Sequence, residues 1–377
     1  MASDSGHVLI ACDKFKGSLT AHEVIARLEE GLREGAPGVE VRSVVVADGG
    51  DGTLDAAESA GFTPEPVQCT GPTGEPVQTR YARRGGEAVV EMADACGLGR
   101  LPGGERRPLE ASSAGLGEVV AAALDAGIRD LVIGIGGSAS TDGGAGMLTA
   151  LGTRFLDAEG VELPPGGGSL TRLASVDLDG LHPALTAARI TVACDVDNPL
   201  LGEQGAAAIF GPQKGATPED VDLLDAGLAR LAELVEAETG RHVADQPGAG
   251  AAGGVGWAAL CVLGATMRPG IEIVLDLNDF DALARGARLV VTGEGSLDLQ
   301  TLLGKAPAGV ARAARRAEVP IVAVCGRALL SEEDAKEAGF DRLYRLTDLE
   351  PDESRCMAEA GPLLTRLAAE VARTELG

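Results

Sequence analysis

Short apolar runs rich in β-branched residues alternate with segments of helical periodicity near both ends of the chain. Residues 8–12 predict a first strand, Thr20 and Glu23 form a capping-box pair that predicts the start of a helix, and residues 41–46 predict a second strand. Near the C-terminal end the same alternation predicts strands at 288–292, 321–325 and 343–346, and helices at 307–317 and from 331 onward. Strand–helix–strand order of this kind is typical of a parallel sheet.

The pattern changes between residues 63 and 108, where Pro, Gly and Arg become frequent and the apolar runs become short. We therefore expect a different part of the structure to begin near residue 65. Its predicted elements are strands at 79–82, 88–92, 131–136 and 190–194, and helices at 112–126 and from the pair Thr217-Pro218 onward. With 377 residues the chain is long enough for roughly two domains.

Loops that combine glycine with an acidic side chain follow apolar runs at residues 47–53, 134–146 and 292–298. Ligands of parallel sheets bind beyond the carboxyl ends of the strands, where such loops lie. Glycine lets backbone N–H groups approach a ligand, and the hydroxyl groups of the 134–146 loop add further donors. The three loops together predict one site for an anionic ligand that carries a bound metal ion.

Composition narrows the classes of function. Asp and Glu number 57 against 32 Lys and Arg, which gives a formal net charge of −25, and aromatic residues make up only 2%. This field repels nucleic acids, and stacking platforms for bases are scarce. The longest apolar stretch, residues 255–267, is shorter than the roughly 18 residues of a membrane span. Seven scattered cysteines and the absence of a signal-peptide pattern predict reduced thiols and a cytoplasmic protein.

Several local motifs are too weak to decide the function. Residues 134–139 and 248–253 match the dinucleotide fingerprint by spacing, but the chain has 54 glycines and neither match continues as the fingerprint requires. Residues 299–305 resemble a broken phosphate-binding loop, of which Lys305 remains useful because it precedes a helix that begins with proline. Ser138 and Ser140 lack the G-x-S-x-G context of a hydrolase nucleophile.

Charged candidates gather in the loops that follow the strands. The acidic ones are Asp13, Asp48, Asp51, Asp142, Asp195, Asp197, Glu294 and Asp298, and the basic ones are Lys14, Lys16, Lys214 and Lys305. Mg²⁺ prefers one or two carboxylates together with water and substrate phosphates. We therefore expect about two of these acids to hold a metal ion, another to act as a base, and the rest to orient the backbone.

Many ordered segments together resemble a bacterial glycerate kinase of the family that contains the glycerate 2-kinases. The segments are 15–18, 47–53, 134–146, 193–200, 210–216, 247–254, 268–272 and 292–295. The resemblance implies an α/β fold of two domains, with a Rossmann-like parallel-sheet domain built from residues 1–65 and 285–377 and a second, inserted α/β domain from 66–284. It places the active site in the cleft between them. It also implies the reaction, in which ATP phosphorylates D-glycerate with the help of Mg²⁺ and 2-phosphoglycerate is the favoured product.

Roles for individual residues are hypotheses built on this resemblance. We expect the nucleotide phosphates to meet Gly136, Gly137, Ser138, Ser140, Asp142, Gly293 and Lys305. The metal ion is expected on Asp195 or on the pair Glu294 and Asp298, and Asp48 or Asp195 is the expected base. Lys16, Lys214 and Lys305 would balance the phosphate charge. The expected partners are small molecules, and the protein is expected to be a monomer or a homodimer.

The chain departs from the family pattern at three positions. Lys14 takes the place of a serine, Thr141 stands where asparagine is common, and Ser296 replaces the arginine of a Gly-Glu-Gly-Arg segment. Two alternatives to a kinase stay open at this point. One is an NAD-dependent hydroxy-acid dehydrogenase that uses residues 134–139, and the other is a relative that binds a ligand without catalysis.

Overall fold

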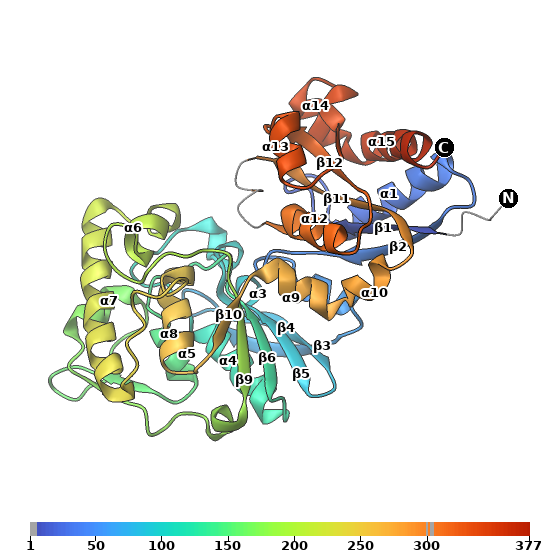
Figure 1. The fold of residues 1–377 in the computed structure, drawn as a ribbon. Helices are drawn as coiled ribbons and strands as arrows, with labels where there is room; N and C mark the ends of the chain where they lie inside the picture. The colour runs from blue at the N-terminus through green and yellow to red at the C-terminus, as the bar shows by residue number, and fades with distance from the viewer. Residues whose placement is uncertain (1–5, 299–300, 302–304) are drawn as a thin grey trace. The chain divides into compact units, whose positions relative to one another are not determined.

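The computed structural model describes residues 6–298, 301 and 305–377. It divides into two compact units, one formed by Met1–Asp48 with Ile271–Gly377 and the other by Gly49–Gly270 (Figure 1). These boundaries lie earlier in the chain than the predicted ones at residues 65 and 285. Helix α2 (Thr53–Ser59) packs on strands of the second unit, and helix α10 (Phe280–Ala284) packs on elements of the first. The boundaries between the two units therefore depend on how these helices pack, which cannot be read from the composition of the sequence.

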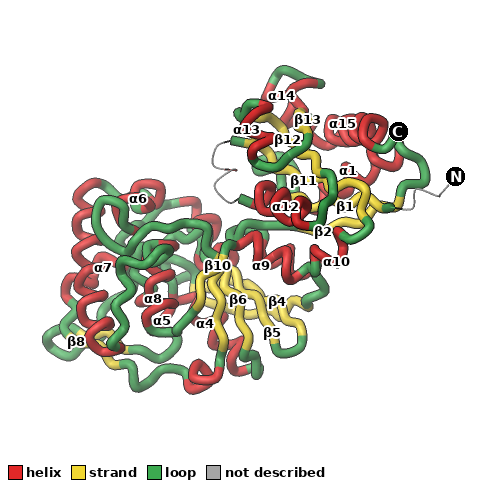
Figure 2. The backbone as a smooth tube through the Cα atoms, in the orientation of Figure 1, coloured by secondary structure: helices red, strands yellow, loops and turns green. Residues whose placement is uncertain are grey.

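The first unit contains a five-stranded sheet in the order β13-β12-β11-β1-β2, and every pair in it is parallel. Its strands, yellow in Figure 2, are β1 (His7–Cys12), β2 (Glu40–Val45), β11 (Ala287–Leu297), β12 (Ile321–Ala328) and β13 (Arg342–Arg345). The strands predicted from the apolar runs are confirmed, with ends shifted by a few residues. The parallel α/β character expected for this part of the chain is confirmed as well.

One face of this sheet is covered by α1 (Ala21–Gly35) and α15 (Ala360–Glu375), which pack against each other. Thr20 and Glu23 form the predicted capping box at the start of α1. Gly31 lets the two helices approach, since a Cβ there would lie 2.1 Å from the carbonyl oxygen of Thr365. The other helices of the unit are α9 (Gly270–Leu277), α10, α12 (Ala306–Arg316), α13 (Glu332–Glu337), α14 (Glu353–Ala358) and the short 3₁₀ turn η7 (Leu346–Asp348).

The second unit contains a six-stranded mixed sheet in the order β10-β9-β6-β5-β4-β3. Its strands are β3 (Thr63–Thr70), β4 (Pro76–Arg84), β5 (Glu87–Glu91), β6 (Asp130–Gly134), β9 (Arg189–Ala193) and β10 (Thr266–Arg268). The pairs from β10 to β5 are parallel, and β4 pairs antiparallel with both β5 and β3. A separate two-stranded ribbon joins β7 (Arg154–Leu156) to β8 (Ser175–Asp177).

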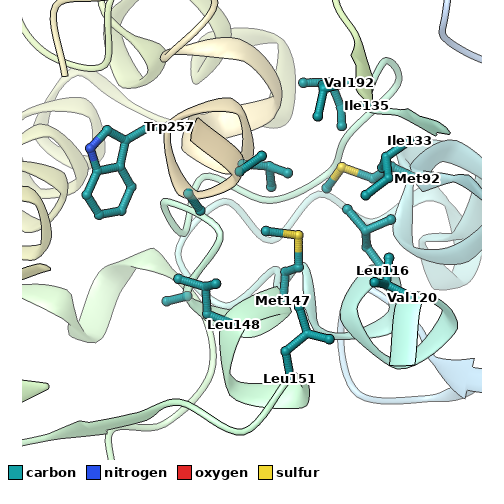
Figure 3. Close-up of a cluster of buried hydrophobic side chains, with 14 of the residues drawn as sticks. Met92, Leu116, Val120, Ile133, Ile135, Met147, Leu148, Leu151, Val192 and Trp257 are labelled. Carbon is teal, nitrogen blue, oxygen red and sulfur yellow. The ribbon is translucent and has the colours of Figure 1, made fainter. Parts of the chain in front are cut away.

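Helices of the second unit surround a core in which Met92, Ile133, Met147 and Trp257 are buried (Figure 3). The α-helices are α2, α3 (Met92–Cys96), α4 (Ala114–Asp125), α5 (Ala145–Ala150), α6 (Ala206–Phe210), α7 (Pro218–Thr239) and α8 (Val255–Cys261). The 3₁₀ turns are η1 (Leu98–Arg100), η2 (Pro102–Gly104), η3 (Gly167–Arg172), η4 (Pro183–Ala187), η5 (Pro212–Lys214) and η6 (Ala251–Gly254). Thr217 caps α7, as its sequence predicted.

All seven cysteines lie in the described part of the chain as free thiols, and six of them are buried. Burial raises the pKa of the Cys194 thiol, the partly exposed one, to about 11. Across the residues that the structure describes, no helix has both the length and the apolar character needed to cross a membrane.

Candidate functional site

An acidic cluster lies at the carboxyl edge of the first unit's sheet. Asp13 follows β1, Asp48 comes three residues after β2, and Glu294 lies in β11, so three adjacent strands each contribute one carboxylate. Burial raises the pKa of Asp13 to about 7, and the charges of Asp48 and Glu294 raise it further. The backbone N–H and the charge of Lys14 oppose this shift, the N–H by donating to Asp13 Oδ1 at 2.6 Å.

Thr301 joins two of the predicted metal ligands. Its hydroxyl donates to Glu294 Oε1 at 2.6 Å, and its N–H donates to Asp298 Oδ1 at 3.2 Å. Burial raises the pKa of Glu294, whereas the charge of Lys305 lowers it. Lys305 is the N-cap residue of α12, and its effect on the pKa of Glu294 places these two candidate residues near each other. The remaining residues of the broken loop, 299–300 and 302–304, lie outside the described part.

Two further predicted residues of this unit have backbone roles or surface positions. Gly293 is forced to be glycine, because a Cβ there would lie 2.0 Å from the carbonyl oxygen of Val324. Its own carbonyl oxygen accepts the N–H of Asp13 at 3.2 Å, which fixes the start of the β1 loop. Lys16 is exposed in a tight turn that Phe15 and Leu19 close by mutual backbone hydrogen bonds.

The glycines at the end of β6 and directly after it let the loop after β6 pack against the loop that contains Gly49 and Gly50. A Cβ on Gly136 would lie 2.6 Å from Gly50 Cα, and one on Gly134 would lie 2.7 Å from the Gly49 carbonyl oxygen. The N–H of Gly136 donates to that carbonyl at 3.3 Å, so a nucleotide phosphate would compete with Gly49 for it. Gly137 has a φ of +73°, and its carbonyl oxygen accepts the N–H of Leu98 at 2.9 Å.

Asp142 is fully buried and anchors the same loop from inside. Its Oδ2 accepts the N–H and the hydroxyl of Ser113, both at 2.8 Å, and the N–H of Gly146 at 3.2 Å. Its Oδ1 accepts the N–H of Gly144 at 3.1 Å. These bonds use the carboxylate to shape the turn that leads into α5. This geometry favours a positioning role for Asp142 over direct contact with a nucleotide.

Lys214 is buried beside this loop, with 1% of its surface exposed. Its Nζ donates to the carbonyl oxygen of Ser140 at 2.5 Å. Burial lowers the pKa of Lys214 to about 7, while the negative charge of Asp142 opposes the shift. The side chains of Ser140 and Thr141 are also buried, and their hydroxyl oxygens have no hydrogen-bond partner among the described residues. Ser138 is 7% exposed and pairs through its backbone with Gly97.

Asp195 follows β9 at the carboxyl end of the second unit's sheet. Its Oδ1 accepts the N–H of Gly270 at 3.0 Å, which ties it to the segment after β10. The loop that follows Asp48 is fixed in a similar way by the buried Glu91, whose Oε2 accepts the N–H groups of Gly52 at 3.3 Å and Leu54 at 2.9 Å. Burial raises the pKa of Glu91 to about 7.

The geometry of the carboxylates at these strand ends limits how they can hold a metal ion. Within residues 6–298, 301 and 305–377, no three His, Cys, Asp or Glu side chains are arranged to hold a metal ion by themselves. Mg²⁺ needs only one or two protein carboxylates when phosphate oxygens complete its coordination. Glu294 and Asp298, which Thr301 links, are hard oxygen donors of that kind, so the residues present fit the ion.

Comparison with known proteins now decides the family. A model of the glycerate kinase family matches residues 8–375. The chain belongs to the glycerate kinase family. Glycerate kinase from Bacillus subtilis (strain 168) is 44% identical over 369 residues, which cover 97% of this chain and 96% of that protein. Glycerate 2-kinase from Escherichia coli (strain K12) is 45% identical over 322 residues, 85% of this chain and 84% of that protein.

A solved structure leads to the same family. The crystal structure assigned as a glycerate kinase 2 from Salmonella typhimurium LT2 superposes with a TM-score of 0.85 at 43% identity, and the match covers 98% of both chains. The resemblance noted in the sequence is thus confirmed, as is the α/β fold with parallel strands. Membership of the glycerate kinase family makes this chain an enzyme that transfers a phosphoryl group.

Three residues that support the glycerate kinase loops were not found from the sequence. They are Thr301, Ser113 and Glu91. Thr301 and Ser113 donate hydrogen bonds to Glu294 and Asp142, and Glu91 accepts one from the N–H of Leu54. Ser113 precedes a predicted helix and Glu91 ends a predicted strand, so both looked like ordinary boundary residues. Their contacts depend on tertiary packing, for which a single sequence carries no signal.

Proposed function

We propose that this chain phosphorylates D-glycerate with ATP and Mg²⁺ and that 2-phosphoglycerate is the product. The observation that carries the proposal is the family match over residues 8–375, together with a relative named glycerate 2-kinase that aligns with 85% of the chain. Phosphoryl transfer depends mainly on alignment and on neutralising charge. The candidate residues of the first unit and those of the second unit each offer groups suited to those tasks.

The first unit supplies oxygen ligands and cations. Mg²⁺, when bound, neutralises phosphate charge and orients the phosphates. Glu294 with Asp298 would hold it, and Asp195 is the alternative ligand. Lys305 already acts on Glu294 electrostatically and would balance the charge of the nucleotide. Lys16 is exposed and free to turn toward a carboxylate or a phosphate.

The second unit supplies a rigid loop. Gly136, Gly137, Ser138 and Ser140 would offer hydrogen bonds to the phosphates, and Asp142 and Lys214 hold that loop from inside. Lys214 itself is buried, so we propose that it acts on the phosphates indirectly, by holding the loop that binds them. A loop fixed in this way loses little conformational entropy when it binds a ligand.

Asp48 and Asp195 are the candidates for the base that removes the proton from the attacking hydroxyl. A well-placed acid–base group contributes roughly 10²–10⁴-fold to the rate. We expect Asp48→Asn or Asp195→Asn to lower kcat by about that factor while the circular dichroism spectrum is unchanged. A variant that keeps the kcat of the wild type would reject that residue as the base.

A coupled assay of ADP formation across a series of hydroxy acids, with ³¹P NMR of the product, tests the proposal. The expected result is turnover with D-glycerate and a phosphorus signal coupled to the single proton at C2. Coupling to the two protons at C3 would instead show phosphorylation of the 3-hydroxyl group, and absence of ADP formation would reject the activity. A titration of nicotinamide fluorescence separates the dehydrogenase alternative, which the family match does not favour.

The remaining expectations concern the setting of the enzyme. Small molecules are the proposed partners, and a monomer or a homodimer is the proposed state. The seven free thiols support a reducing compartment, and we propose the cytoplasm.

A further inference from the structure

Ser296 and Arg327 lie side by side on adjacent parallel strands. They are Cα partners in the register of β11 and β12, and Arg327 Nε donates to Ser296 Oγ at 3.3 Å. The preceding residues on the two strands are Gly295 and Gly326. A Cβ on Gly326 would lie 2.6 Å from the Gly295 carbonyl oxygen, so the strands approach closely here. The guanidinium group is therefore placed beside residue 296 by the backbone itself.

This pair lies on the same face of the sheet as Glu294. Residues two apart on a strand share a face, so Ser296 follows Glu294 along one side of β11. Val291 and Val324 belong to the core beneath α1 and α15, which assigns Glu294, Ser296 and Arg327 to the other face by alternation. Arg327 thus lies at the carboxyl edge of this sheet, where ligands of parallel sheets bind, and its guanidinium group reaches out to Glu353 of α14.

Arg327 forms a weak ion pair with Glu353 that a ligand can replace. Its Nη1 donates to Glu353 Oε2 at 2.9 Å and to Oε1 at 3.1 Å. The side chains of Arg327 and Glu353 are 45% and 63% exposed, and ion pairs at such exposed positions contribute little to stability. An oxyanion that arrives at this edge can therefore take over the guanidinium group, which suits phosphate and carboxylate geometry.

We propose that Arg327 binds an oxyanion of the substrates from β12 and replaces the arginine that the family resemblance places at position 296 on β11. This inference rests on the proposed function. The chemistry is shared by two sources, the phosphates of the nucleotide and the carboxylate of the hydroxy acid. The serine at 296 leaves space for the guanidinium group and gives its Nε an acceptor.

Exchange of the two side chains tests the proposal. Arg327→Ser is expected to lower kcat/KM about 10- to 100-fold, as loss of a charge-assisted hydrogen bond does. The double variant Ser296→Arg/Arg327→Ser puts the cation back from the other strand and should recover most of that loss. Arg355→Ser is the matched control, because Arg355 is an exposed arginine of α14 that pairs with Glu350, and it should retain the activity of the wild type.

The substrate whose KM rises in Arg327→Ser identifies which oxyanion Arg327 binds. A rise in KM for ATP, with weaker binding of ADP in calorimetry, assigns Arg327 to the phosphates, whereas a rise in KM for D-glycerate alone assigns it to the carboxylate. Unchanged kinetics and unchanged ADP affinity in Arg327→Ser overturn the proposal. So does a loss of activity that accompanies a lowered melting temperature and that the double variant does not recover, because that result shows a purely structural role. Failure of the proposed function would instead appear as a wild type without turnover, and ADP calorimetry would still report on Arg327.

Discussion

Lys214 donates a hydrogen bond of 2.5 Å from its buried Nζ to the carbonyl oxygen of Ser140. Two residues further along the chain, Asp142 accepts hydrogen bonds from Ser113 and from the turn into α5. The loop that carries the predicted phosphate-binding groups is therefore held from inside by the buried side chains of one lysine and one aspartate. Neither side chain needs to touch a substrate to control where the loop lies.

Replacement of Lys214 by methionine is expected to impair catalysis by releasing this loop. A shift of about 1 Å in a catalytic loop can lower the rate by roughly 10²-fold. We expect kcat/KM of Lys214→Met to fall by about 10- to 100-fold in the coupled assay. Lys336→Met, at an exposed position of α13, is the control and should match the wild type. Full activity in Lys214→Met would show that the lysine does not hold the loop.

The same lysine should make stability depend on pH. Burial lowers its pKa from 10.5 in the unfolded chain to about 7, so the folded protein resists its protonation. Below about pH 7 the amine is protonated in both the folded and the unfolded state, so the full cost of burying its charge lowers stability. Between pH 7 and 10.5 the unfolded state binds more protons than the folded state, so stability increases as the pH rises. We expect the free energy of unfolding of the wild type to rise relative to Lys214→Met over that window in urea titrations. If the unfolding free energies of the wild type and Lys214→Met changed with pH in parallel, the amine of Lys214 would not be buried in its neutral form.

The strands and capped helices could be predicted because their signals are local. The capping box at Thr20 and the helix starts at Thr217 and Ser331 are all present in the structure. β3 was not predicted, because it is largely exposed and contains Pro64 and Pro66, so its apolar alternation is weak. Its backbone pairs with β4, a relationship that is set by the hairpin and that composition does not show.

The sequence shows which strand ends carry acidic and glycine residues, but it does not show the contacts that these residues make. Asp13, Asp48 and Glu294 act on one another electrostatically because the carboxyl ends of parallel strands share an edge. The glycines after β6 illustrate the limit. Their spacing favoured phosphate binding, yet Gly134 and Gly136 are required by the close approach of Gly49 and Gly50. A single sequence does not distinguish a glycine that admits a ligand from one that admits another loop.

Glu91 should give the opposite pH dependence to Lys214. Burial raises its pKa from 4.5 to about 7, so its contribution is complete below about pH 4.5 and is lost as the pH rises through 7. Glu91→Gln keeps an acceptor for the N–H groups of Gly52 and Leu54 and removes the charge. We expect the wild type to lose stability relative to Glu91→Gln between these pH values, measured by urea unfolding. Glu159→Gln, in an exposed turn, is the control, and an equal slope in both variants would contradict the buried carboxylate.

Gly136 provides the test of loop packing in the second unit. An alanine there would place its Cβ 2.6 Å from Gly50 Cα, a backbone atom that cannot turn away as a side chain does. The loops after β2 and β6 must then separate, and overpacking of this kind costs about 1–3 kcal/mol. We expect Gly136→Ala to lower the free energy of unfolding by that amount and to lower kcat/KM as well, since Asp48 immediately precedes the displaced segment. Gly99→Ala is the matched control because its Cβ would meet no atom within 4 Å. Equal stability of the two variants would mean that the loops can yield, and that the glycine at 136 is kept for a ligand.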